Sequence, residues 1–166
     1  MLKQICIVAS AVLALSACQS QKSAGFTTPS PVYTNGLNTS VDAEGQILAL
    51  INAERAQAGL PPLEYNGVLT RAARRHAQEQ AQYGYFSHTG RDGSSSAQRA
   101  RRAGYDYCIV GENISMGHSS AQAAMQGWMV SKGHRDNILN RRFTEVGIGI
   151  AQGALYVTVF GDRCAG

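Results

Sequence analysis

Two β-rich runs lie together near the end of this chain, after a series of helical patterns. The runs Glu145–Ala151 and Leu155–Phe160 are separated by Gln152-Gly153-Ala154, a spacing typical of a β-hairpin. Earlier apolar periodicities and cap residues predict helices over Asp42–Gly59, Val68–Tyr83, Ser95–Ala103, Ser119 or Ser120 to Met129, and Asp136–Asn140, with a short strand at Tyr105–Val110. Helices first and an antiparallel hairpin last predict an α+β fold, with helices packed on a small, mainly antiparallel sheet.

The composition excludes several classes of protein. Apolar residues make up 44% of the 166 residues, which is enough to build a core and excludes wholesale disorder. No apolar run reaches the roughly 20 residues that a membrane-spanning helix needs, so a multi-pass membrane protein is excluded. The net charge of +4, from 15 Lys+Arg and 11 Asp+Glu, is mild. We therefore expect no nucleic-acid partner, and a monomer is the default.

The first residues have the pattern of a targeting signal. Lys3 precedes an apolar stretch from Ile5 to Leu15, which has the length of a signal-peptide core and is too short to span a bilayer. The run Leu15-Ser16-Ala17-Cys18 resembles a bacterial lipobox, which implies cleavage before Cys18 and lipidation of that cysteine. The alternative is an ordinary signal peptide that is cut near Ala17.

This pattern divides the chain into a lipoprotein signal peptide (1–17), a lipidated Cys18 with a flexible tether (18–40) and a folded domain (41–166). The tether is rich in Ser, Thr, Gln, Gly, Asn and Pro, without periodicity. Several acyl chains on Cys18 would anchor the protein stably, so the lipid bilayer is the first expected partner. By analogy with lipoprotein sorting, Gln19 favours the outer membrane or the periplasmic side of the cell envelope.

Two cysteines remain in the folded domain, Cys108 and Cys164. Export leads to an oxidising compartment, where a disulfide between them is the simple interpretation. Ligation of a metal ion by the two thiols is the alternative, although no CxxC spacing supports it.

Three residues are candidates for chemistry. His88 lies in the turn-rich segment Tyr85–Gly90, and His134 lies in the run Trp128–Leu139. Glu112 follows the expected strand as an isolated carboxylate among apolar and glycine residues, where it needs a partner if it is buried. Their spacings match no local metal motif, so the residues alone leave a His-Glu-His site as one hypothesis among several.

Several motifs of this chain occur in the order typical of one family. In chain order they are LINAERAQAGLPPLEYN, RAARRHAQEQA, FSHTG, RRAGY, GENI, WMVSKGHRDNIL and the ending EVGIGIA…YVTVF, which together cover about Gln46 to Gly161. They resemble the CAP superfamily (cysteine-rich secretory proteins, antigen 5 and pathogenesis-related 1), most closely its short bacterial SCP-like branch. The resemblance implies an α-β-α sandwich with a central cleft into which His88, Glu112 and His134 project. The family's second acidic residue corresponds to Ser131, which leaves three ionisable groups.

Two neutral imidazoles and a carboxylate can bind a divalent metal ion, zinc above all, with Glu112 as a ligand or as a hydrogen-bonded partner of a ligand. Without a metal, Glu112 can orient one histidine as a general base. Members of the family are associated with sterol or lipid binding, metal binding and occasional claims of proteolysis, and no common reaction unites them. We expect a cell-envelope lipoprotein whose cleft can bind a divalent metal and takes an apolar, lipid-like or cell-wall ligand.

Two alternatives remain open. One is a zinc-dependent or His/Glu-dependent hydrolase of envelope peptides or glycans, and the other is an interaction protein with a vestigial cleft.

The remaining polar residues have structural interpretations. His76 lies on the apolar face of the second helix and is expected to be a hydrogen-bonded core histidine, whereas His118 is a solvated loop residue. Asn113 and Asn137 are expected to hold backbone turns around the cleft. Two arginine clusters are interpreted as solvated helix faces or, alternatively, as contacts with anionic lipid headgroups or the cell wall: Arg71, Arg74 and Arg75, and Arg99, Arg101 and Arg102.

Overall fold

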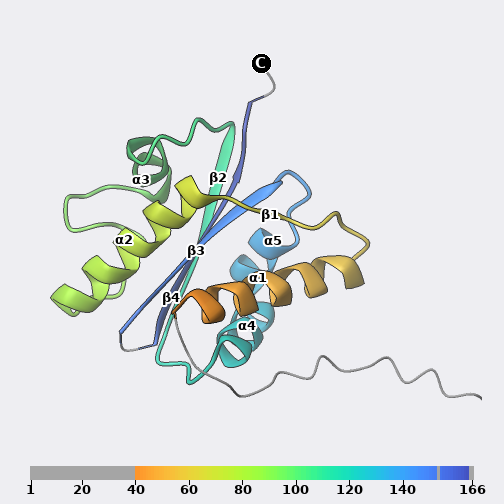
Figure 1. The fold of residues 1–166 in the computed structure, drawn as a ribbon, viewed down its shortest axis with the longest axis horizontal. Coiled ribbons are helices and arrows are strands. Elements are labelled where there is room, and N and C mark those ends of the chain that lie inside the picture. Colours follow the sequence, from red (N-terminus) through yellow and green to blue (C-terminus); the bar gives the residue numbers. More distant parts are fainter. Residues whose placement is uncertain (1–39, 153, 165–166) are drawn as a thin grey trace, which may run out of the picture. The chain divides into compact units, whose positions relative to one another are not determined.

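A computed structural model describes residues 40–152 and 154–164 of the chain. Its helices and strands follow in the order α1 (Ser40–Gln57), β1 (Glu64–Tyr65), α2 (Gly67–Tyr83), α3 (Ser96–Arg102), β2 (Ile109–Met116), α4 (Ala121–Val130), α5 (Lys132–Ile138), β3 (Glu145–Ala151) and β4 (Leu155–Asp162) (Figure 1). The strands form one sheet in the order β1-β3-β4-β2. Only β1 pairs in parallel with its neighbour, so the expected α+β class with a mainly antiparallel sheet is confirmed.

Helices cover both faces of this sheet, each above its own core. On one face, α1, α4 and α5 pack over a core that includes Trp128 and Phe160. On the other face, α2 and α3 pack over a core that includes Leu69 and Val157. Alternate residues of β3 and β4 point to opposite faces and therefore serve the two cores in turn. The α-β-α sandwich that the family resemblance implied is thus confirmed.

The helix boundaries follow from capping residues. The Asn66 side chain accepts hydrogen bonds from the first backbone N–H groups of α2, and α2 ends at Gly84, whose φ of 64° suits glycine. Ser95 caps α3 in a reciprocal capping box with Gln98, and Ser120 caps α4. Gly84 and Ser95 together delimit the loop that carries His88.

The strand expected at Tyr105–Val110 lies later in the chain, as β2, Ile109–Met116. Its Gly-Glu-Asn run has low intrinsic strand propensity, but continuous pairing along the whole of β4 outweighs that preference. The correction matters for function, because Glu112 does not follow the strand but lies within it, opposite Val159.

Other boundaries also differ from the expectations. Asp42, expected as an N-cap, lies in the first turn of α1. The one-turn helix expected at Asp136–Asn140 is instead α5, which begins at Lys132 and therefore includes His134. The two-residue strand β1 was not expected, since two residues carry no periodicity.

Two glycines of β3 allow α2 to lie very close to the sheet. A Cβ atom at Gly147 would lie 2.1 Å from the backbone of Leu69 and Thr70, and one at Gly149 would lie 2.3 Å from the backbone nitrogen of Arg74. No side chain fits in either position, so the depth at which α2 packs depends on these two residues.

A buried arginine joins α1 to the segment that follows α5. The side chain of Arg55, 1% exposed, donates hydrogen bonds to the backbone carbonyls of Pro61, Ile138, Asn140 and Phe143. Burial lowers the pKa of Arg55, and these four carbonyls accept from all three nitrogens of its side chain. These hydrogen bonds hold the C-terminal end of α5, the helix that carries His134.

The expected disulfide between Cys108 and Cys164 is confirmed, and it joins the start of β2 to the residues after β4. Residues 36–166 form one compact unit that includes both cores and this disulfide. This segment therefore has the packing that it needs to fold on its own.

Within residues 40–152 and 154–164, no helix is long and apolar enough to cross a membrane. The predicted signal peptide, Cys18 and the tether up to residue 39 lie outside the described residues, and those assignments stay predictions. Residue 40, the predicted end of the tether, is the first residue of α1.

Candidate functional site

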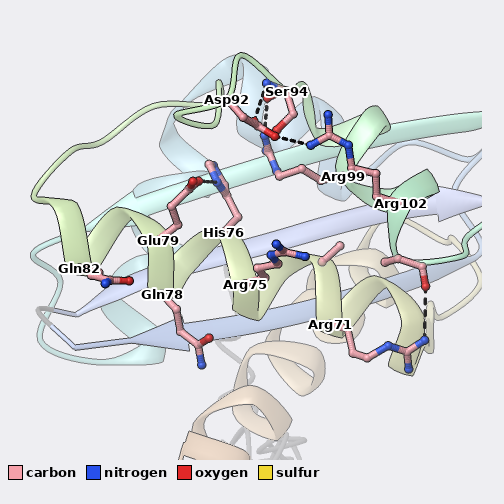
Figure 2. Close-up of a pocket in the computed structure, with 12 residues that line it drawn as sticks. Arg71, Arg75, His76, Gln78, Glu79, Gln82, Asp92, Ser94, Arg99 and Arg102 are labelled. Atoms are coloured by element: carbon pink, nitrogen blue, oxygen red, sulfur yellow. Dashed lines mark hydrogen bonds and ion pairs between the residues drawn. The ribbon is translucent and has the colours of Figure 1, made fainter.

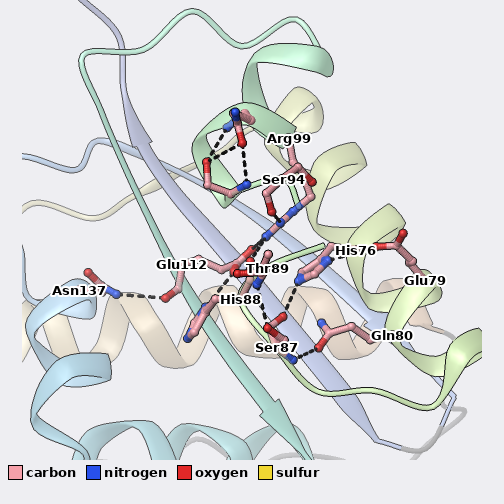
Figure 3. A network of polar contacts seen from close by, with 12 residues as sticks. His76, Glu79, Gln80, Ser87, His88, Thr89, Ser94, Arg99, Glu112 and Asn137 are labelled. Carbon is pink, nitrogen blue, oxygen red and sulfur yellow. Dashed lines mark hydrogen bonds and ion pairs between the residues drawn. The ribbon is translucent and has the colours of Figure 1, made fainter. Parts of the chain in front are cut away.

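Glu112 lies at the centre of a polar network that joins β2, α3 and the loop between α2 and α3 (Figure 3). Its side chain is only 2% exposed, and both carboxylate oxygens have partners. Oε1 accepts a hydrogen bond from Nδ1 of His88 at 2.9 Å, and Oε2 accepts one from a guanidinium nitrogen of Arg99 at 2.7 Å. The buried negative charge is thereby compensated and hydrogen-bonded, as a buried carboxylate requires.

His88 has one ring nitrogen engaged and the other free to accept. A carboxylate only accepts hydrogen bonds, so Nδ1 of His88 is the donor to Glu112, and Nε2 of the neutral ring carries the lone pair. The His88 side chain is 56% exposed. Figure 3 shows its ring with one nitrogen toward Glu112 and the other directed away from the network.

The loop on either side of His88 is held by three side chains. Nε2 of His76 donates to the carbonyl of Ser87 at 2.9 Å, and the side-chain oxygen of Gln80 accepts from the Ser87 N–H at 2.9 Å. Arg99 also donates to the carbonyls of His88 and Ser94, at 3.0 and 2.6 Å. The expectation that His76 is a hydrogen-bonded core histidine agrees with these contacts, and its partner is the loop that presents His88.

His134 lies on α5, and two asparagine side chains join α5 to β2 through hydrogen bonds. The Asn113 side chain donates to the carbonyl of His134 at 3.0 Å, and the Asn137 side chain donates to the carbonyl of Glu112 at 3.2 Å and to the side-chain oxygen of Asn113 at 2.9 Å. Burial, and secondarily the positive charge of protonated His88, lower the pKa of His134. Its imidazole is therefore neutral at pH 7, with one nitrogen able to accept.

The structure assembles the predicted trio only in part. His88 and Glu112 are in direct contact, and Asn113, the residue after Glu112 in β2, hydrogen-bonds to the backbone of His134. Within residues 40–152 and 154–164, no group of three or more His, Cys, Asp or Glu side chains is placed to hold a metal ion. Glu112 is engaged by two other side chains, so of its two expected roles the geometry favours the hydrogen-bonded partner of His88 rather than a direct ligand.

Arg99 is the functional residue that sequence reasoning missed. It was interpreted as part of a solvated or lipid-contacting cluster, yet its side chain is only 10% exposed. Its neighbours Arg101 and Arg102 are exposed as expected. The signal that could have found it was Glu112 itself, since a carboxylate that is buried in an apolar stretch needs a partner such as a cation.

Comparison with known proteins agrees with this architecture. The model of the Cysteine-rich secretory protein family, CAP, matches residues 48–160. The uncharacterised protein YkwD of Bacillus subtilis is 35% identical over 129 residues, which are 76% of this chain and 50% of YkwD. The chain thus spans half the length of that relative.

Solved structures show the same fold. An extracellular protein from Bacillus anthracis that contains an SCP domain matches with a TM-score of 0.72 and 31% identity, over 80% of this chain and 46% of that chain. An outer surface protein of Borrelia burgdorferi matches with a TM-score of 0.71 and 18% identity, over 76% of this chain and 97% of its own. The latter likeness concerns the fold alone.

Proposed function

The chain belongs to the cysteine-rich secretory protein (CAP) family, and from this premise we propose that it is an exported cell-envelope binding protein whose cleft holds a divalent metal ion between His88 and His134. The observation that carries the proposal is the hydrogen bond from Nδ1 of His88 to the buried Glu112, which leaves Nε2 as an acceptor. A carboxylate on the second nitrogen is the usual support for a metal-binding histidine.

The donor set fits zinc better than magnesium or calcium. Neutral imidazole nitrogens suit zinc, whereas the harder cations prefer oxygen ligands. The lowered pKa of His134 favours the neutral ring that a ligand must have. When bound by two protein ligands, zinc would supply open positions for a ligand's polar group. Glu112 would orient His88, and Arg99 would compensate the charge of Glu112.

Two exposed apolar side chains support an apolar or lipid-like ligand. Phe86, 47% exposed, and Val130, 83% exposed, lie within four residues of His88 and His134 in the chain. A polar centre with apolar neighbours is the common composition of a small-molecule site. The Bacillus anthracis relative is described as extracellular, and the disulfide suits an exported protein, which supports the proposed place in the cell envelope. The proposed anchor at Cys18 rests on the lipobox-like run Leu15–Cys18 alone.

A hydrolase of envelope peptides or glycans is the second candidate. It is favoured by the same contact, because an imidazole oriented by a buried carboxylate can take a proton at Nε2 as a general base. Turnover of cell-wall fragments by the wild type, lost on replacing Glu112 by glutamine, would favour catalysis over binding alone.

Calorimetric titration of residues 36–166 with zinc tests the metal site. We expect one ion per chain at micromolar affinity or tighter, and loss of binding in both His88→Ala and His134→Ala. Glu112→Gln should retain binding but weaken it by about 10- to 100-fold, because it alters the partner of a ligand rather than a ligand.

His118→Ala is the matched control, since His118 is a half-buried histidine whose ring packs beside Gly127 of α4. Its affinity for zinc should equal that of the wild type. The proposal fails if the folded wild type binds no zinc, or if His118→Ala abolishes binding while His134→Ala does not.

A further inference from the structure

A polar cavity lies between α2, α3 and the loop that joins them (Figure 2). Its volume is about 740 Å³. Four arginines line it, two from α2 and two from α3: Arg71, Arg75, Arg99 and Arg102. Two acidic residues, Glu79 and Asp92, also line it, so cations exceed anions on its walls.

The four arginine side chains differ in how strongly they already bind other protein groups. Arg99 is engaged by Glu112, and Arg102 is paired with Asp92. Arg71 makes only two long contacts, each of 3.4 Å, to backbone carbonyls. Among the described residues, the Arg75 side chain has no hydrogen-bond or ion-pair partner, and it is exposed. Arg71 and Arg75 therefore have guanidinium donors available for an anionic ligand.

The inner wall of the cavity presents a hydrogen-bond acceptor that lacks a donor. The ring of His76 is fully buried, and its Nε2 must donate, because its partner is the carbonyl of Ser87. Burial and the charge of Arg99 lower the pKa of His76, so the ring is neutral and Nδ1 is an acceptor. Nδ1 has no hydrogen-bond partner in the described structure. Oε2 of Glu79 lies 3.8 Å from Nδ1, but it is an acceptor too and already receives a hydrogen bond from the Tyr85 hydroxyl at 2.6 Å.

These two walls lie one helical turn apart. Arg71, Arg75 and Glu79 follow one another at intervals of four residues, so they lie along one face of α2, and His76 adjoins the Glu79 end. A ligand along this face meets guanidinium donors at one end and the unpaired Nδ1 of His76 at the other. It therefore needs an anionic group and, about one helical turn away, a hydrogen-bond donor.

We infer that this cavity binds a small phosphoester with a free hydroxyl group, of which the phosphoglycerol unit is the simplest example. The phosphate is bound by Arg71 and Arg75, whose planar guanidinium groups match its oxygens. The hydroxyl group donates to Nδ1 of His76, satisfying the buried acceptor. This site is separate from the proposed zinc site and does not depend on it.

Calorimetry on residues 36–166 with glycerol 3-phosphate, inorganic phosphate and glycerol tests the assignment. We expect one site for glycerol 3-phosphate and about tenfold weaker binding of inorganic phosphate, because a buried acceptor left unsatisfied costs about that factor. Glycerol, which lacks the charged group, should show no measurable binding. Arg71→Gln combined with Arg75→Gln should weaken glycerol 3-phosphate binding at least about tenfold.

The matched control is Arg141→Gln combined with Arg142→Gln, which removes the same charge from two exposed arginines of the segment between α5 and β3. It should bind within about twofold of the wild type. Glu79→Gln tests the hydroxyl group. The new amide can donate to Nδ1 of His76, so the preference for glycerol 3-phosphate over inorganic phosphate should largely disappear.

Vesicles distinguish the two sources of the phosphoglycerol unit. Sedimentation with vesicles of phosphatidylglycerol in phosphatidylcholine, reduced by the Arg71/Arg75 change and unaffected by the Arg141/Arg142 change, assigns a lipid headgroup. Binding of glycerol 3-phosphate without such vesicle binding assigns a soluble phosphoester. The inference is overturned if glycerol 3-phosphate does not bind, if both double variants weaken it equally, or if inorganic phosphate binds as tightly.

Discussion

Replacing Glu112 by alanine should lower the free energy of unfolding by about 3–5 kcal/mol, because it leaves the guanidinium of Arg99 without the carboxylate that compensates its charge. The side chains of Glu112 and Arg99 are 2% and 10% exposed, so water screens and solvates the stranded cation little. The substitution also removes the hydrogen-bond acceptor of Nδ1 in the His88 ring. Urea unfolding of residues 36–166 at pH 7 measures the change.

The control is Glu64→Ala, which removes an exposed glutamate from β1 and should change stability by less than about 0.5 kcal/mol. A double variant measures the interaction energy between the two side chains. Glu112→Ala with Arg99→Ala should cost less than the sum of the single changes by at least about 1 kcal/mol, because the second change removes the stranded charge. Strictly additive losses would show that the two side chains do not depend on each other.

Replacing Gly147 by alanine should destabilise the protein by about 3 kcal/mol, because the new methyl group overlaps the α2 backbone. The Cβ atom would lie 2.1 Å from backbone atoms of Leu69 and Thr70, which cannot move aside as a flexible side chain can. The midpoint of thermal unfolding should fall by about 10 °C. Because α2 also carries His76 and Gln80, outward movement of α2 should disturb the loop that holds His88.

Gly45→Ala is the matched control, since Gly45 is an exposed residue of α1 with no atom within 4 Å of the added Cβ position. Alanine is the better helix former, so this variant should be more stable than the wild type by up to about 1 kcal/mol. A Gly147→Ala protein that unfolds at the wild-type temperature would disprove the close packing of α2 on β3.

Local signals predicted most of the fold. Ser95 marked the start of α3, and either Ser119 or Ser120 was expected at the start of α4, where the structure has Ser120. The hairpin of β3 and β4 followed from two β-rich runs around a glycine. The continuation of β2 past Val110 could not be read locally, because Gly111, Glu112 and Asn113 are poor strand formers that are extended through pairing with β4. Strand β1 is too short to show any period.

The site was predictable as a set of residues but not as a geometry. The motifs indicated His88, Glu112 and His134. The hydrogen bonds to the two carboxylate oxygens of Glu112, however, depend on the packing of α3 beside β2. The buried role of Arg99 and the unpaired nitrogen of His76 are consequences of tertiary contacts between segments distant in sequence. A charged residue in a basic cluster carries no local sign that it is paired.

The most direct test of the site is the protonation of the histidine rings, measured by long-range ¹H–¹⁵N correlation on residues 36–166 at pH 8, above the reference imidazole pKa of about 6.5. Before zinc is added, His88 should carry its proton on Nδ1. One equivalent of zinc should shift Nε2 of His88 and one nitrogen of His134, and leave His76 and His118 unchanged. A proton on Nε2 of His88, or zinc shifts confined to His118, would contradict the arrangement in which Glu112 holds His88 ready to bind.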